Sequence, residues 1–251
     1  MKHTDHSFSI ITICYNCENS IEKTILSVLN QNYKNFEYII IDGNSKDNTV
    51  NIINKYKTKI DKIIIENDKG IYDALNKGIA LAKNEIIGFL HAGDIYFSND
   101  VLTEYNRNFI EDIDIIYSNL IIKNYSNNKI IRDWKSSQFL INNFYKGWSP
   151  PHPTFYAKKK CYINNGNFDL NYKISSDIDL MFRYLEVKKI KSRYINKYSI
   201  IMESGGLSNK NILNKIKLNL EIIKILKSHN PKFSILVFLF KKFFLKFYQY
   251  I

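Results

Sequence analysis

The chain has 251 residues and carries 36 Lys and Arg against 24 Asp and Glu, a net charge of +12 at pH 7. A hydrophobic fraction of 45% with 14% aromatic residues excludes a disordered or low-complexity protein, and the length suits one α/β domain or two small ones. The charge is uneven, because residues 1–100 are slightly acidic whereas residues 206–251 hold nine lysines and one acid. A protein that tracks phosphates with its main domain would show the opposite distribution, so we expect no nucleic-acid partner.

Four short apolar runs alternate with segments of helical periodicity in the first hundred residues. The predicted strands cover residues 8–15, 38–41, 60–65 and 86–90. This alternation predicts βαβ units and a parallel sheet, whose ligands bind at the carboxyl ends of the strands. Asp42, Asp68 and Asp94 follow the second, third and fourth strands. Any one of them could simply form a loop, but a carboxylate after each of three strands favours a nucleotide and metal site.

The second half of the chain changes character. We expect a strand at 113–117, a hairpin of 120–125 and 129–134, a rigid loop at 147–153, a strand at 154–157 and a helix that begins near 174 with a Ser/Asp cap. No linker rich in Pro, Gly or Ser interrupts these elements. The sequence therefore predicts one catalytic domain over residues 1–205, followed by a basic amphipathic tail over residues 206–251.

The tail combines helical periodicity with aromatic residues and lysines. Its first predicted helix has one apolar face formed by Ile212, Leu213, Ile216, Leu220 and Ile223. The apolar run after Pro231 is too short to span a bilayer, but an apolar, Lys-bearing segment suits the membrane interface. The alternative is a tail that packs on the catalytic domain or in a homodimer.

The cysteine content and the first residues bear on the compartment. Three cysteines are too few for a disulfide framework, and the polar first six residues lack the apolar core of a signal peptide. We therefore expect a cytoplasmic protein attached peripherally to the inner face of the membrane. Cys14 and Cys17 have the spacing of a redox pair, but Cys14 falls on a buried strand position and we interpret it as core.

Five motifs in chain order carry a family resemblance over roughly residues 8–205. They are Tyr15-Asn16, Asp42-Gly43-x-Ser45-x-Asp47-x-Thr49, Asp68-Lys69-Gly70-Ile71-Tyr72-Asp73-Ala74-x-Asn76-Lys77-Gly78, Gly88-Phe89-Leu90-x-Ala92-Gly93-Asp94, and His152-Pro153-Thr154-Phe155 with Ser176-Asp177-x-Asp179-Leu180-x-x-Arg183. Together they resemble family 2 glycosyltransferases of the bacterial colanic-acid and O-antigen type. The resemblance implies an α/β, A-type glycosyltransferase fold with a mostly parallel central sheet and flanking helices, to which this chain adds C-terminal amphipathic helices.

The resemblance also implies an activity. It is the inverting transfer of a sugar from a nucleotide-diphosphate donor, with a UDP-sugar favoured, to a hydroxyl of a lipid-linked glycan acceptor in cell-surface polysaccharide synthesis. A divalent cation, Mn²⁺ or Mg²⁺, would neutralise the charge that grows on the leaving diphosphate. A carboxylate would take the proton of the attacking hydroxyl, and the family's catalytic aspartate corresponds to Asp177.

Other roles carry over by position. The donor would meet Tyr15, Asn16, Asp42, Asp68, Lys69, Gly70, Asp73, Asn76 and Lys77. The acceptor or the diphosphate would meet Trp148, His152, Asp179 and Arg183. For the second set structural roles compete with function, because Trp148 could anchor a loop, Asp179 could cap a helix and Arg183 could pair with a carboxylate.

The segment after the fourth strand departs from the family pattern. Many members carry Asp-x-Asp-Asp where this chain has His91-Ala92-Gly93-Asp94. Asp94 is the expected metal ligand, with His91 as a second one, unless the diphosphate itself holds most of the metal. The missing acids also keep open a non-catalytic nucleotide-sugar-binding scaffold protein. A nucleotidyltransferase is disfavoured because the first glycine, Gly43, follows the second strand rather than the first.

Overall fold

The computed structural model describes residues 5–125, 127–205 and 212–249. The strands are β1 (Phe8–Cys14), β2 (Phe36–Asp42), β3 (Lys62–Ile65), β4 (Ile86–Phe89), β5 (Ile95–Tyr96), β6 (Ile115–Asn124), β7 (Lys129–Trp134), β8 (Tyr156–Lys158) and β9 (Ser192–Glu203). The α-helices are α1 (Ile21–Leu29), α2 (Thr49–Lys55), α3 (Ile71–Leu81), α4 (Val101–Asn108), α5 (Lys159–Asn165), α6 (Ser176–Phe182), α7 (Ile212–His229) and α8 (Ile235–Phe247). Short 3₁₀ turns η1 (Lys57–Lys59), η2 (Phe144–Lys146) and η3 (His152–Thr154) and a π-turn η4 (Arg183–Val187) complete the fold.

The strands form one mixed sheet in the order β3-β2-β1-β4-β8-β6-β9-β5, with β7 paired to β6. The first half is parallel, as expected, because β1 pairs with both β2 and β4, and β2 pairs with β3. The second half adds antiparallel pairs of β8 with β4 and β6, and of β7 with β6. The carboxyl ends of β1 to β4 therefore lie along one edge, and the second half extends the same sheet.

The predicted break between 113–117 and 120–125 is wrong, because β6 runs without interruption through Ser118 and Asn119. Both polar residues are buried and bonded within the fold. The Ser118 hydroxyl lies 2.5 Å from that of Ser199, and the side-chain oxygen Oδ1 of Asn119 accepts from Tyr194 Oη at 2.7 Å. A shift in the β6–β9 register at these two residues accommodates them.

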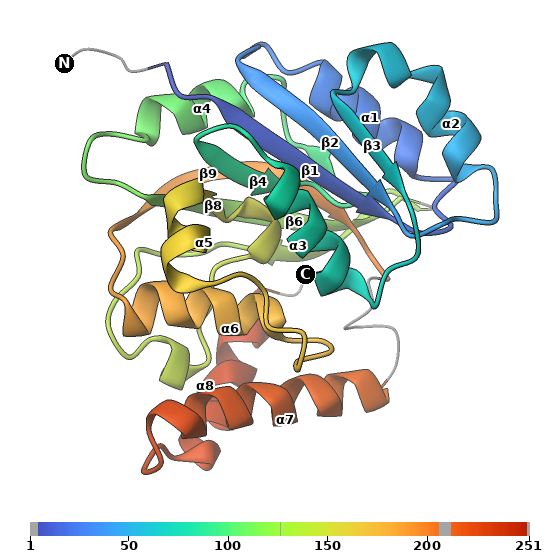
Figure 1. Cartoon of the computed structure of the whole chain (residues 1–251). Coiled ribbons are helices and arrows are strands. Elements are labelled where there is room, and N and C mark those ends of the chain that lie inside the picture. Colours follow the sequence, from blue (N-terminus) through green and yellow to red (C-terminus); the bar gives the residue numbers. More distant parts are fainter. Residues whose placement is uncertain (1–4, 126, 206–211, 250–251) are drawn as a thin grey trace.

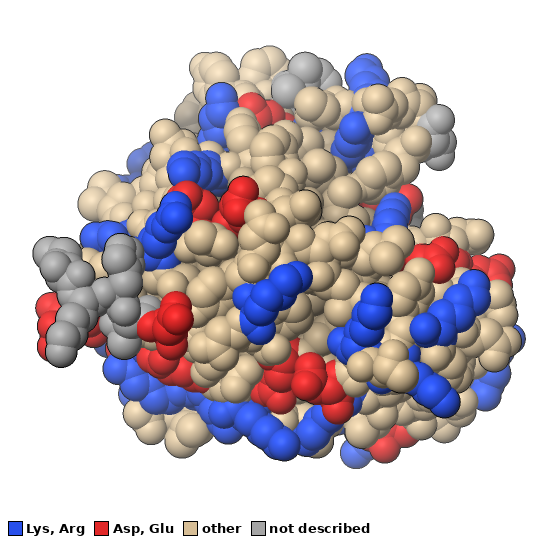
Figure 2. Space-filling model, turned by 90° about the horizontal axis from the view of Figure 1, so that it is seen from above, with Lys and Arg blue, Asp and Glu red and all other residues tan. Residues whose placement is uncertain are grey.

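Helices cover both faces of the sheet (Figure 1). Alternate β1 residues point to opposite faces, so Ile10 packs with α1, α2 and α4 while Ile11 packs with α3 and α6. The tail helices α7 and α8 lie on the second face, beside α6 (Figure 1). On the face seen in Figure 2, described basic and acidic side chains are interspersed rather than gathered into one basic patch.

The tail packs on the catalytic domain, which is the structural alternative considered above. Its buried apolar residues are Ile222, Ile225, Leu226 and Phe238. The predicted apolar face of α7 is only partly correct: Ile223 packs against the core, whereas Leu213, Ile216 and Leu220 are 66%, 50% and 60% exposed. The helix is apolar on more than one side, so periodicity could not show which side is buried. Within the described ranges, no helix is long and apolar enough to cross a membrane.

A carboxylate of the tail completes the start of α6. Glu221 accepts hydrogen bonds from the backbone N–H groups of Lys173, Ile174 and Ser175 at 3.0–3.1 Å, and from Ser175 Oγ at 2.7 Å. The predicted Ser cap is therefore corrected, because the Ser175 hydroxyl donates to Glu221 and makes no bond to the helix backbone. Residues 47 positions apart thus build the turn that precedes Asp177.

Helix α8 is held near its middle and just beyond its C-terminal end. Gly147 has φ +80°, and a Cβ there would lie 2.5 Å from Lys242 Cβ and 2.7 Å from its Cα, so only glycine lets α8 sit against this loop. Beyond the C-terminal end, the Gln249 carbonyl accepts from Asp133 N at 2.8 Å and its side chain accepts from Arg132 Nε at 2.9 Å. These contacts fix α8 beside β7 and the loop that carries Trp148.

Candidate active site

A cavity of about 1370 Å³ runs from the carboxyl ends of the first strands to the inner sides of α7 and α8. It brings together predicted site residues from all parts of the sequence. Those that line it are Tyr15, Asn16, Asp68, Gly70, His91, Asp94, Trp148, His152 and Asp177. Side chains predicted from motifs far apart in the chain therefore share one cavity, as an active site requires.

The strand-end side of the cavity is built by three loops. The Tyr15 ring is 58% exposed, and a Cβ at Gly43 would lie 3.3 Å from it, so glycine lets the second loop approach the ring closely. Asn16 ties these loops together, since its side-chain oxygen accepts from Lys46 N at 2.8 Å. Asp68 lies beside the same glycine, because its Oδ2 would be 3.0 Å from that Cβ, and its carboxylate is held 2.8 Å from Lys77 Nζ. An aromatic face beside a carboxylate can bind a planar ring that carries N–H groups.

Asp42, predicted to contact the nucleotide, does not line this cavity. It is fully buried, and its carboxylate accepts from Ser45 N at 2.7 Å and from Ser45 Oγ at 2.6 Å. The Cys14 thiol donates to the same carboxylate. Burial also raises the pKa of Cys14 far above its usual value, so this thiol stays protonated at neutral pH. A protonated, buried thiol is a core group and does not suit redox chemistry.

Four predicted donor contacts on or near α3, none of which lines the cavity, instead hold the local structure. Asp73 accepts from Lys69 N at 3.0 Å, which fixes the turn that begins the helix. Asn76 bonds the backbone of Phe168 twice, at 2.9 and 3.0 Å. Lys77 is engaged by Asp68 and by further acids.

Asp177 lies in the first turn of α6 with its carboxylate facing the cavity. Tyr72 Oη donates to Asp177 Oδ1 at 3.1 Å. Burial raises the pKa of Asp177 to about 6, which keeps it ionised at neutral pH and makes it a stronger base than an exposed carboxylate. This carboxylate therefore suits the general-base role.

Two histidines in the lining of the same cavity stack on each other. The ring centroids of His91 and His152 are 5.8 Å apart, and each also stacks on Phe89. Burial lowers the pKa of His91 to about 3 and that of His152 to about 4, so both rings are neutral at pH 7. Within the described residues, His91 Nδ1, His152 Nε2 and Trp148 Nε1 are buried without a hydrogen-bond partner. Such atoms in a cavity wall are available to a polar ligand.

Asp94 lies beside an acid that the sequence analysis missed. Glu203, the last residue of β9, lines the same cavity and forms an ion pair with Lys23 at 2.8 Å. Burial, and then the charge of Glu203, raise the pKa of Asp94 to about 8. No group of three or more His, Cys, Asp or Glu that could hold a metal exists among the described residues. A cation here would therefore draw on Asp94, His91 and oxygens of the substrate. No motif marks Glu203, and only the sheet brings it to Asp94.

Asp179 and Arg183, predicted to flank the acceptor or the diphosphate, do not line the cavity. Asp179 Oδ2 lies 2.8 Å from Arg183 Nε, and the guanidinium also donates to the backbone carbonyls of Asn165 and Asn167. The pair fastens the loop after α5 to α6. This is the ion-pair alternative that was open for Arg183.

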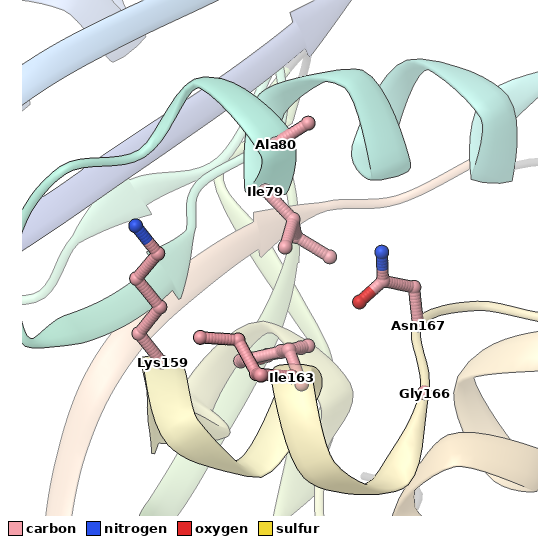
Figure 3. A pocket seen from close by; sticks show the side chains of 7 residues that line it. Ile79, Ala80, Lys159, Ile163, Gly166 and Asn167 are labelled. Carbon is pink, nitrogen blue, oxygen red and sulfur yellow. The ribbon is translucent and has the colours of Figure 1, made fainter.

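A second cavity of about 390 Å³ lies between α3 and α5 (Figure 3). It is lined mainly by Ile79, Ala80, Tyr162 and Ile163, and its one charged side chain, Lys159, donates to the Ala82 carbonyl. None of the predicted site residues lines it. The larger cavity is therefore the candidate active site.

Comparison with known proteins agrees with this geometry. A protein of Mycobacterium bovis named PGL/p-HBAD biosynthesis glycosyltransferase is 27% identical over 240 residues, which cover 90% of this chain and 91% of that protein. An Escherichia coli protein named UDP-Glc:alpha-D-GlcNAc-diphosphoundecaprenol beta-1,3-glucosyltransferase WfaP is 38% identical over 118 residues, 46% of each chain.

Solved structures confirm the predicted A-type glycosyltransferase fold. Staphylococcus aureus TarS 1-349 in complex with UDP matches with a TM-score of 0.64 at 17% identity, over 88% of this chain. The match spans 65% of that TarS chain, which is less than two thirds of its length. The mannosyltransferase PcManGT from Pyrobaculum calidifontis, in complex with GDP-Man and Mn²⁺, matches with a TM-score of 0.63 at 15% identity, over 96% of this chain and 70% of that one. The sequence model of glycosyl transferase family 2 matches residues 9–169, and the chain belongs to that family.

Proposed function

We propose that the protein transfers a sugar, with inversion, from a UDP-sugar or related nucleotide-diphosphate donor to a hydroxyl of a lipid-linked glycan acceptor in cell-surface polysaccharide synthesis. The observation that carries the proposal is the single cavity shared by Tyr15, Asp68 and Asp177. The name of the E. coli relative describes a UDP-glucose donor and a diphosphoundecaprenol-linked acceptor, and TarS has been solved with UDP, which supports the same substrate classes here.

The residues suggest how the reaction proceeds. The nucleotide base stacks on the Tyr15 ring beside the Asp68 carboxylate, and the sugar extends towards Asp177. Asp177 takes the proton of the acceptor hydroxyl while the oxygen of that hydroxyl bonds to the anomeric carbon. The bond from the anomeric carbon to the nucleoside diphosphate breaks on the opposite face. Tyr72 keeps the carboxylate oriented, and the uncharged His152 and Trp148 offer hydrogen-bonding nitrogens to the phosphates.

The residues near β4 fit a divalent cation, Mn²⁺ or Mg²⁺. Asp94 offers a carboxylate, and His91 offers a neutral ring with an unpartnered nitrogen. When bound, the cation would neutralise charge on the leaving diphosphate. Two protein ligands are enough for such a role if phosphate oxygens supply the others.

The direct test is to incubate the purified protein with a panel of UDP-, GDP- and dTDP-sugars, with Mn²⁺ or Mg²⁺, and to measure release of nucleoside diphosphate. We expect release with one donor and faster release when a diphosphate-linked glycan is added. Donor binding without any release would favour the scaffold alternative, and release of pyrophosphate would favour a nucleotidyltransferase.

Activity should fall at acid pH because the base must be ionised. The pKa of Asp177 is raised to about 6, so kcat should be constant above pH 7 and drop about tenfold for each unit below about pH 6. Tyr72 donates to the carboxylate and so stabilises the ionised form of Asp177. Tyr72→Phe should therefore raise the pKa of Asp177 and move the fall of kcat to higher pH. Profiles of kcat against pH for the unchanged protein and for Tyr72→Phe check both statements. If the two profiles fall at the same pH, the hydrogen bond from Tyr72 does not stabilise the ionised Asp177.

We also propose that the tail attaches the protein to the inner face of the cytoplasmic membrane. The outer side of α8 presents Leu236, Phe240, Phe243 and Phe247, which are 64–81% exposed. Lys241 lies among them and suits an anionic lipid surface. Helix α8 therefore has two apolar sides: one packs on the domain through Phe238, and the other is exposed.

The replacement Phe240→Ser/Phe243→Ser should weaken binding to anionic lipid vesicles about tenfold or more, because two large apolar side chains are removed from the contact. Flotation with vesicles of anionic or neutral lipid measures the effect. Ile163→Ser, which alters a 71% exposed side chain on α5, is the matched control. A variant that still floats but changes from dimer to monomer would indicate that this face forms a homodimer instead.

A further inference from the structure

Three basic side chains line the tail end of the cavity. Arg132 comes from β7, and Lys242 and Lys246 come from α8. Arg132 is 6% exposed, lies over the Trp134 ring at 3.8 Å and donates to Gln249. Lys242 Nζ donates to Asn219 Oδ1 at 2.8 Å. Among the residues that the structure describes, neither lysine forms an ion pair with a carboxylate.

The mutual proximity of these cations opposes their charge. Burial, and then the charges of Lys246 and Arg132, lower the pKa of Lys242 to about 7. Burial, and then the charges of Arg132 and Lys215, lower the pKa of Lys246 to about 8. Like charges gathered in one cavity, with neither lysine paired to a described carboxylate, raise the free energy of the unliganded protein. A bound polyanion would remove this cost, and its two or more negative charges would match three cations.

The two sides of α8 place this cluster beside the proposed membrane face. Phe238, Lys242, Leu245 and Gln249 recur at helical spacing and line the cavity. Leu236, Phe240, Phe243 and Phe247 recur at the same spacing and are exposed. One helix thus separates the cavity from the apolar outer surface by its own width, about 10 Å.

The three cations come from different parts of the chain than the residues proposed to bind the nucleotide. Tyr15 and Asp68 follow the first and third strands, whereas the cations come from β7 and the tail. Leu218, Ile222 and Leu226 of α7 add apolar surface to the same end of the cavity. An anion joined to a hydrocarbon chain matches this combination better than the phosphates of a free nucleotide.

We propose that Arg132, Lys242 and Lys246 bind the diphosphate that joins the glycan acceptor to its lipid carrier. The inference rests on the proposed function, which it deepens by assigning the acceptor's diphosphate to a defined place. The lipid leaves the cavity along α7 and α8 towards the exposed phenylalanines, and the glycan extends from the diphosphate towards Asp177. Asp177 and the cations then recognise opposite ends of one acceptor.

Binding of a short-chain prenyl diphosphate tests this directly in the full chain. Both tryptophans of the protein, Trp134 and Trp148, line the cavity, so their fluorescence reports occupancy without a label. We expect Lys246→Gln and Lys242→Gln/Lys246→Gln to weaken prenyl diphosphate binding at least tenfold. Lys227→Gln, which removes an exposed charge from α7 outside the cavity, should bind as the unchanged protein does.

Three arms separate the outcomes. Inorganic pyrophosphate should bind more weakly than the prenyl diphosphate, and equal affinity would overturn the assignment to a lipid. Titration with UDP checks the nucleotide side in each protein; variants that lose UDP but keep the prenyl diphosphate would place the cations at the donor and overturn the proposal. So would an unchanged protein that does not bind the prenyl diphosphate.

Release of nucleoside diphosphate from a sugar donor is measured on the same preparations. Release without prenyl diphosphate binding refutes only the cation site. Prenyl diphosphate binding without release from any donor leaves the cation site in place and refutes the proposed transfer reaction.

Discussion

Replacing Asp177 by Asn should lower the transfer rate by a factor of about 10² to 10⁴ while the donor still binds. The amide has the shape of the carboxylate and can still accept from Tyr72 Oη, so the first turn of α6 should keep its structure. It cannot take a proton from the acceptor hydroxyl at neutral pH. We therefore expect a loss in kcat with little change in the donor's KM, measured as nucleoside diphosphate released in the presence of acceptor.

Glu111→Gln removes an exposed carboxylate and is the control for the loss of one charge. An Asp177→Asn protein with full activity would exclude this residue as the base. A loss confined to KM would instead indicate that the carboxylate only positions a substrate.

Replacing Glu221 by Ala should have the largest effect on stability. Its carboxylate accepts four hydrogen bonds from Lys173, Ile174 and Ser175, and the deletion leaves these donors without that partner. We expect a loss of about 2–4 kcal/mol in the free energy of unfolding. For a chain of this length that corresponds to a fall in Tm of roughly 5–15 °C. Transfer activity should fall as well, because the turn leads directly into Asp177.

Lys217→Ala is the control on the same helix, since that lysine is exposed. Glu221→Gln should lie between the two, because one amide oxygen replaces two carboxylate oxygens. Thermal unfolding followed by circular dichroism distinguishes the three proteins. Equal Tm values for Glu221→Ala and Lys217→Ala would show that α7 does not stabilise the start of α6.

The parallel half of the fold could be predicted because its signals are local. Each βα unit has an apolar strand, a polar turn and a periodic helix, and the turns place Tyr15, Asp68 and Asp94 at one edge. The exact roles of neighbouring side chains could not be predicted. The Asp42 carboxylate accepts a hydrogen bond from the backbone of the loop that follows it, at Ser45 N. The sequence does not show which acid of a loop points into the cavity.

The second half depends on contacts between distant residues. Glu203 meets Asp94 only through the pairing of β9 with β5 and β6, and no short motif contains both. Arg183 was assigned to substrate although Asp179 lies four residues before it, at the spacing that forms an ion pair on a helix. The buried side of α7 followed from tertiary packing, and its sequence is apolar enough to fit either side.

Because α7 and α8 form one end of the cavity, the order of synthesis bears on when this protein can act. At 5–20 residues per second, a ribosome makes the segment from β4 to α8 in roughly 7–30 seconds. Within this segment Phe144 and Phe182 are made before α7 and α8, beside which they are buried in the folded chain. The nascent chain thus exposes an aromatic surface suited to chaperone binding. The tail end of the cavity, to which we assign the diphosphate of the acceptor, is therefore completed only when α7 and α8 have been made.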